Sequence, residues 1–146
     1  MGYDELRNIQ VLNTRRHLVV DDAFKDDFCY RSATYDDYGP GDYKIVMRNL
    51  EAHQPVILAG CATAYLIPFP IWWYWTTDCH MWVCDGYERR KTECSTILYF
   101  HMNWGWNEVF SRGNYNGWYF YNVWWPSGTD FNFYNYSQNF VYDIPP

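Results

Sequence analysis

The spacing of apolar side chains is typical of helices in the amino-terminal third of the chain and of β-strands after it. Residues 16–29 and 42–52 each place apolar side chains near one helical face, and Asp42 is a suitable N-cap for the second segment. The stripes are Leu18, Val19, Ala23, Phe24 and Phe28 in the first, and Tyr43, Val46, Met47 and Leu50 in the second. Residues 30–41, which are rich in Asp and Gly and contain Pro40, are expected to form a loop. The amino-terminal third therefore predicts two short helices.

From Val56 onward the pattern predicts strands. The continuous apolar run from Val56 to Ala59 is typical of a strand that is buried on both faces. Further strands are predicted at His80–Tyr87, Ser95–Trp104, Gly117–Val123 and Asn139–Tyr142. Two helices followed by antiparallel strands predict an α+β fold, with the helices on one face or at one end of a twisted sheet. Because no repeat or linker interrupts the chain, residues 1–146 are expected to form a single domain.

Val56 to Trp75 runs without a charged residue over the length of a transmembrane helix. Two prolines, Pro68 and Pro70, and the aromatic run at 72–75 favour a buried strand followed by an irregular aromatic loop. We therefore expect no membrane span.

Composition narrows the class of protein. Aromatic residues make up 23% of the chain, which favours β structure. The formal net charge is −6, and the clusters Arg15-Arg16 and Arg89-Arg90-Lys91 are too small to track a phosphate backbone, so nucleic acid is not an expected partner. The 5 cysteines include no CxxC pair, which predicts neither a closed disulfide framework nor a structural zinc site. A Cys84–Cys94 bridge across a hairpin stays open as an alternative, and no metal or cofactor is expected.

The segment from Cys79 to Trp106 carries the candidate chemistry. If a polar connector, Glu88 to Ser95, closes a hairpin, then His80 lies directly opposite Asn103 on the same sheet face. The Asn103 carboxamide oxygen would accept a hydrogen bond from one imidazole nitrogen, which fixes the tautomer and leaves the other nitrogen as a base. Trp104 would shield this bond from water. This is the orienting half of a Cys-His-Asn site.

Each of these residues also has a structural interpretation. His80 beside aromatic residues fits a packed, hydrogen-bonded histidine, and Asn103 before Trp-Gly-Trp fits a turn residue. The other histidines, His17, His53 and His101, have no comparable partners in the sequence and are interpreted as structural or solvated.

Residues 80–87 (HMWVCDGY) and 101–106 (HMNWGW) resemble the histidine and asparagine motifs of the streptopain family of cysteine peptidases. Residues 54–60 and 116–119 are similar to neighbouring strands of that family, and weaker similarity extends to both ends of the chain. The resemblance implies the carboxy-terminal half of a papain-like domain from a secreted or periplasmic bacterial endopeptidase that is made as a zymogen. It also implies His80 as the general base and acid, Asn103 as its orienting residue and Trp104 as the shield. Because Met1 to Gln10 lack the apolar segment of a signal peptide, an export signal would lie outside this sequence.

The chain also departs from the family pattern. Cys79 stands where the family usually has Gly, Asn107 breaks the usual Gly-Trp-Gly-Gly run, and residues 61–78 form a long aromatic insertion. In the family the nucleophilic Cys opens a helix far ahead of the histidine. Cys61, within Gly60-Cys61-Ala62-Thr63-Ala64, superficially resembles that motif, but a helix there would meet Pro68 and Pro70. A small apolar residue in or beside a strand is the favoured interpretation of Cys61.

The sequence therefore predicts a streptopain-like cysteine endopeptidase module that supplies the His and Asn of the site and is inactive as this chain alone. The nucleophile would come from a missing amino-terminal segment or a second chain, and the substrate would be a peptide or protein. The alternative is a non-catalytic, peptidase-like protein that binds peptides or a peptidase partner. A sugar-binding module, suggested by abundant Trp and Tyr with Asn nearby, is a third possibility.

Overall fold

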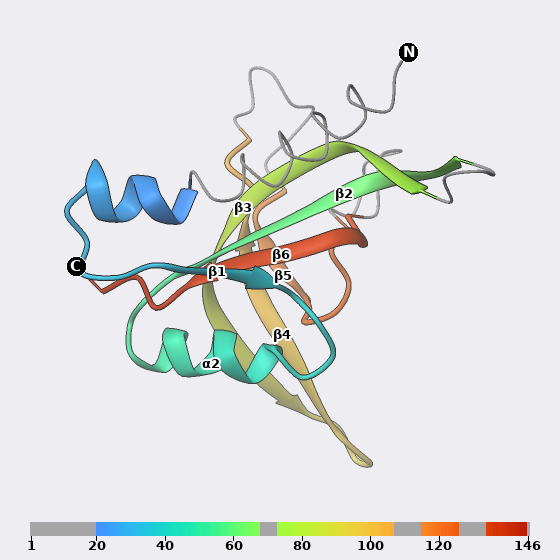
Figure 1. Ribbon diagram of the computed structural model, residues 1–146. Coiled ribbons are helices and arrows are strands. Elements are labelled where there is room, and N and C mark those ends of the chain that lie inside the picture. Colours follow the sequence, from blue (N-terminus) through green and yellow to red (C-terminus); the bar gives the residue numbers. More distant parts are fainter. Residues whose placement is uncertain (1–19, 68–72, 107–114, 126–133, 146) are drawn as a thin grey trace.

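The computed structural model describes residues 20–67, 73–106, 115–125 and 134–145. Within these residues the chain forms two helices and six strands. They are a helix at residues 20–26, β1 (Thr34–Asp37), α2 (Tyr43–Glu51), β2 (Val56–Ile67), β3 (Trp73–Lys91), β4 (Thr96–Asn103), β5 (Gly117–Phe120) and β6 (Tyr136–Tyr142). The strands make one antiparallel sheet in the order β1-β6-β2-β3-β4-β5, with long β2 and β3 at its centre (Figure 1). This arrangement agrees with the predicted α+β class.

Two segments predicted as loops are extended. Thr34–Asp37, in the predicted loop at 30–41, pairs with β6 as an edge strand, where polar side chains are well suited because they remain in solvent. The predicted aromatic loop after Ala59 is instead the paired continuation of β2 and β3, from Gly60↔His80 to Ile67↔Trp73. Its aromatic and β-branched residues satisfy strand geometry, whereas Pro68 and Pro70 fall outside the described residues. No helix in the described ranges has the length and apolarity to cross a membrane.

The two helices cover opposite faces of the sheet, so of the two predicted arrangements, one face or one end, the shared face is wrong. Val46 and Met47 of α2 belong to a buried cluster that includes Leu58 of β2 and Phe140 of β6. The helix at 20–26 joins a second cluster through Val20 and Phe24, which pack with Ala33, Val141, Ile144 and Ile57. Successive residues of a strand point to opposite faces, and β2 and β6 are apolar on both, so each face needs its own cover. The two helices are drawn on either side of the strands in Figure 1.

The pairing of β2 with β6 has an irregularity beside the candidate site. Between the pairs Ala59↔Asn139 and Cys61↔Tyr136, Gly60 alone faces two residues of β6, Ser137 and Gln138, which marks a bulge in β6 opposite Gly60. A Cβ atom at Gly60 would overlap the backbone carbonyl oxygen of Tyr134. Glycine is therefore required here by the close approach of another backbone segment.

Candidate functional site

The predicted register between β3 and β4 is wrong. Strand β3 continues through Glu88–Lys91 of the predicted polar connector, so that Lys91 pairs with Thr96, and Asn103 lies opposite Val83 instead of His80. A shift by an odd number of residues moves a side chain to the other sheet face. The Asn103 side chain therefore lies on the face of Val83, whereas His80 shares the face of the buried Trp82.

The Asn103 carboxamide stabilises a turn. Its Oδ1 accepts a hydrogen bond of 3.1 Å from the backbone N–H of Gly105, which has a φ of 71°. This contact is the geometry of the alternative interpretation, a turn residue that ends the strand. The predicted hydrogen bond between Asn103 and the His80 ring is not formed in the structure.

A backbone carbonyl holds the His80 ring instead. The distance from His80 Nε2 to the carbonyl oxygen of Trp104 is 2.8 Å. Because a carbonyl oxygen only accepts, Nε2 carries the proton and the neutral ring keeps Nδ1 as its acceptor. The main-chain carbonyl of Trp104, and not the side chain of Asn103, therefore fixes the tautomer and leaves Nδ1 free to act as a base.

The peptide unit that contains this carbonyl and the preceding peptide unit are both held by hydrogen bonds. The backbone N–H of Trp104 donates to Oδ1 of Asn116, at 2.9 Å, and the next N–H, that of Gly105, is bound by Asn103. The sequence pattern indicates no role for Asn116 itself. Two signals place it near the site: its position directly before a predicted strand, Gly117–Val123, and the resemblance of residues 116–119 to a neighbouring strand of the streptopain family.

Aromatic rings surround His80. The nearest belongs to Trp106, whose ring centroid lies 4.8 Å from that of His80 in a stacked arrangement. Trp104 is stacked at 6.2 Å and fully buried, and its Nε1 has no hydrogen-bond partner among the described residues. Tyr134 lies at 5.8 Å. The predicted shield, Trp104, thus lies by the ring, but Trp106 is the closer neighbour.

Burial determines the direction of the His80 pKa. The ring is half-buried, and its removal from water lowers the pKa below 6.5, although the hydrogen bond to the Trp104 carbonyl opposes the shift. A histidine with a lowered pKa is neutral at pH 7, as a general base must be.

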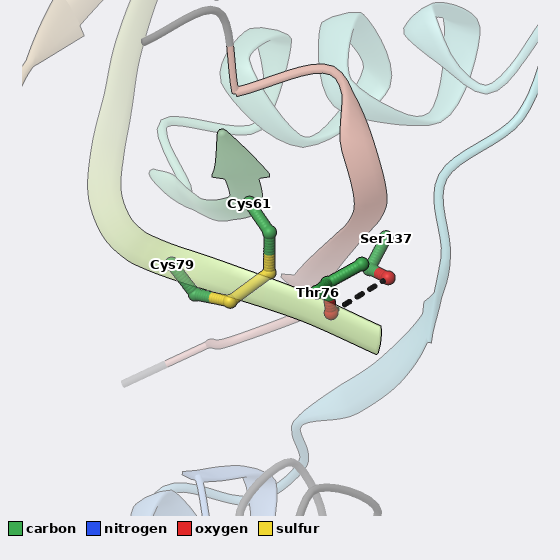
Figure 2. The surroundings of a disulfide bond; sticks show 4 residues. All are labelled: Cys61, Thr76, Cys79 and Ser137. Atoms are coloured by element: carbon green, nitrogen blue, oxygen red, sulfur yellow. Dashed lines mark hydrogen bonds between the residues drawn. A yellow bond between two sulfur atoms is a disulfide. The ribbon is translucent and has the colours of Figure 1, made fainter. Parts of the chain in front are cut away.

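Two of the cysteines form a disulfide that the sequence did not predict. Cys61 of β2 and Cys79 of β3 are directly paired residues and are bridged (Figure 2). Cys61 lies in a strand, as the favoured interpretation placed it, but its sulfur is bonded. The alternative Cys84–Cys94 bridge does not form: both are free thiols, Cys84 buried and Cys94 exposed.

His101 has a partner that the sequence did not reveal. Its Nδ1 lies 2.6 Å from Oδ1 of Asp85, and its ring contacts Trp118 edge-on. The pair forms because a register shift between Cys84 and Gly86 brings Asp85 beside His101. His53 is exposed, and His17 lies outside the described residues.

One family model matches the chain. The model of the Peptidase C10 family matches residues 7–119, a range that contains both candidate motifs. A search among curated proteins finds no match.

Proposed function

This chain belongs to the Peptidase C10 family, the streptopain family of cysteine peptidases, and on that premise we propose that it is the histidine-bearing part of a cysteine endopeptidase. The observation that carries the proposal is the hydrogen bond from His80 Nε2 to the Trp104 carbonyl. It leaves Nδ1 ready to take a proton from a thiol. The sheet with α2 would be the carboxy-terminal half of a papain-like domain in a secreted or periplasmic bacterial protein.

The proposed reaction uses His80 twice. Nδ1 takes the proton of a cysteine thiol, and the thiolate attacks the peptide carbonyl carbon, forming a C–S bond. The imidazolium then protonates the leaving amine as the C–N bond breaks, and the neutral ring activates the water that hydrolyses the acyl-enzyme. The Trp104 carbonyl oxygen carries a partial negative charge, so it stabilises the imidazolium between these steps.

In this proposal Asn103 and Trp104 act through the turn that they share. Asn103 binds the Gly105 N–H and so fixes the peptide unit that presents the Trp104 carbonyl to His80. The indole of Trp104 is fully buried beside the His80 ring, where it excludes water from the bonded side. Asn103 is then a positioning residue for the carbonyl and does not bind the imidazole itself.

Three cysteines are unsuited to be the nucleophile. The sulfur atoms of Cys61 and Cys79 are joined to each other. Cys84 is fully buried, four residues from His80 along β3, and burial raises the pKa of its thiol. A thiol with a raised pKa is a poor source of thiolate.

The remaining two cysteines lie away from the His80 ring. Cys94 is in the β3–β4 turn, on the order of 30 Å along β3 at about 3.3 Å per residue. Cys29 follows the helix at 20–26, which packs on the other sheet face. We propose that the nucleophile comes from a segment outside these 146 residues or from a second chain.

The test joins the chain to whatever coding sequence lies upstream of Met1 in its genome. The joined protein should cleave casein, His80→Ala should abolish cleavage, and His101→Ala should preserve it, because His101 lies on the opposite face. This chain alone should not react with a peptidyl epoxide inhibitor. Labelling of one of its own cysteines, dependent on His80, would overturn the external nucleophile. Cleavage that is indifferent to His80→Ala would overturn the catalytic assignment.

A further inference from the structure

The disulfide lies directly behind the candidate base. Cys79 precedes His80 in β3, and Cys61 follows Gly60, the residue paired with His80 in β2. Since neighbouring residues of a strand point to opposite faces, the bridge is on one face of the sheet and the imidazole on the other. Figure 2 shows the bridge between the two strands.

The sheet is weak at this point without the bridge. Gly60 presents no side chain to its neighbours, and the bulge in β6 opposite Gly60 interrupts the pairing of β2 with β6. On the other side of His80, Trp82 is anchored in the core at 2% exposure. The backbone of His80 is thus fixed by the core on one side and by the disulfide on the other.

The bridge is open to reagents on its own face. Cys79 is exposed although Cys61 is 5% exposed. The next two residues of β3 on that face, Met81 and Val83, are 38% and 36% exposed, and Tyr136, opposite Cys61 in β6, is 48% exposed. A thiol therefore reaches Cys79 without entering the face on which the imidazole lies.

We propose that Cys61–Cys79 is a thiol–disulfide exchange site that holds His80 in position, and that its reduction by a low-molecular-weight thiol releases the His80 ring from the Trp104 carbonyl. The inference rests on the proposed function only in taking His80 as the base. The coupling between bridge and ring is a property of this chain and is measurable without peptidase activity.

The exchange balances with two equivalents of thiol. A thiolate attacks the exposed sulfur of Cys79, the Cys61–Cys79 bond breaks, and Cys61 leaves with the electron pair and takes a proton. A second thiolate attacks the mixed disulfide and releases the Cys79 thiol. The chain gains two thiols and the reductant becomes its own disulfide.

The experiment follows His80 by NMR in the full chain while reduced glutathione is added. Oxidised protein should show a protonated Nε2, and reduction should replace this signal with one averaged between tautomers. Amide exchange at Gly60 and His80 should rise by roughly tenfold or more, while amides of α2 keep their protection, and reoxidation should reverse both changes. Alkylation of the released thiols, detected by mass spectrometry, shows whether the disulfide has been reduced.

A variant that carries both Cys61→Val and Cys79→Val keeps apolar strand residues but removes the exchange. Its His80 signal should be averaged between tautomers before any reductant is added, and addition of glutathione should not change that signal. An unchanged His80 signal after alkylation has verified reduction of the disulfide would overturn the proposal. A disulfide that glutathione does not reduce in the folded chain would also overturn it. Loss of amide-exchange protection throughout α2 would also overturn it, because the disulfide would then stabilise the whole fold and not the position of His80 in particular.

Discussion

At the scale of single residues, the candidate site relies on a main-chain atom where a side chain was expected. The His80 ring needs an acceptor at one nitrogen, and either a carboxamide oxygen or a peptide carbonyl can supply it. Every residue carries a carbonyl, so composition and motif do not reveal which one points at the ring. The Trp104 carbonyl is in reach because Asn103 and Asn116 shape the turn around it.

The first prediction concerns the protonation of His80. Its NMR titration midpoint should lie below 6.5, because burial disfavours the imidazolium. The pKa of His80 is higher in the unfolded chain than in the folded chain, so as pH falls the unfolded chain is protonated first. The free energy of unfolding should therefore decrease as pH falls from about 6.5 through the folded pKa of His80. Trp106→Ala, which uncovers the ring, should move the midpoint upward. A wild-type midpoint at or above 6.5 would contradict the buried arrangement.

The second prediction concerns Asn116, which binds the Trp104 N–H. Asn116→Ala leaves a donor in the buried Trp104 peptide without this acceptor and should lower the free energy of unfolding in urea by about 1 kcal/mol. The matched control is Asn122→Ala at an exposed position, which should change it by less than about 0.5 kcal/mol. Equal effects from both substitutions would mean that the Asn116 hydrogen bond contributes nothing of its own.

At the scale of elements, the existence of strands and helices was predictable and their register was not. The apolar stripe of α2 and the runs at β2 and β4 identify their elements because periodicity depends only on local sequence. Register depends on where a hairpin turns. Arg89–Lys91 look like a polar connector, yet they are paired in β3, with the Arg90 guanidinium 4.2 Å from the Tyr99 ring centroid.

The disulfide was missed for the same reason. Cys61 and Cys79 face each other only if β2 and β3 form one long hairpin, whereas the uncharged run and its prolines predict an irregular loop. Pairing of cysteines across strands follows from register, not from their spacing alone. The individual strands thus followed from local pattern, whereas the pairing that brings site residues together depended on contacts between distant segments.

The third prediction tests the close approach of the Tyr134 backbone to Gly60. Gly60→Ala should lower the free energy of unfolding by about 1–3 kcal/mol, because its Cβ would overlap the Tyr134 carbonyl and force the backbone to move. Gly117→Ala in β5 is the control, since a Cβ there has no atom within 4 Å. Thermal unfolding of the two variants compares them directly. A Gly60 variant as stable as the control would show that the close approach is easily relieved.

At the scale of the whole molecule, two apolar clusters share the same central strands. In β2 and β6, Leu58 pairs with Phe140 on the α2 side, and Ile57 pairs with Val141 on the side of the helix at 20–26. Strands β2 and β6 therefore each contribute residues to both clusters. Loss of one cluster removes the packing on one face of these two strands, so neither cluster should persist without the other.

The fourth prediction is that the chain unfolds in one transition, as a single domain would. Phe140→Ala should cost about 3–5 kcal/mol and Val141→Ala about 2 kcal/mol, since their side chains are buried on opposite faces at 1% exposure each. Tryptophan fluorescence includes the α2 side, where Trp82, Trp104 and Trp124 are buried, whereas far-UV circular dichroism reports the whole backbone. Both signals should keep one common midpoint in each variant, because β2 and β6 transmit the loss of either cluster to the entire sheet. If Val141→Ala shifts the circular dichroism midpoint and leaves fluorescence in place, the two faces unfold independently and the single-domain prediction is wrong.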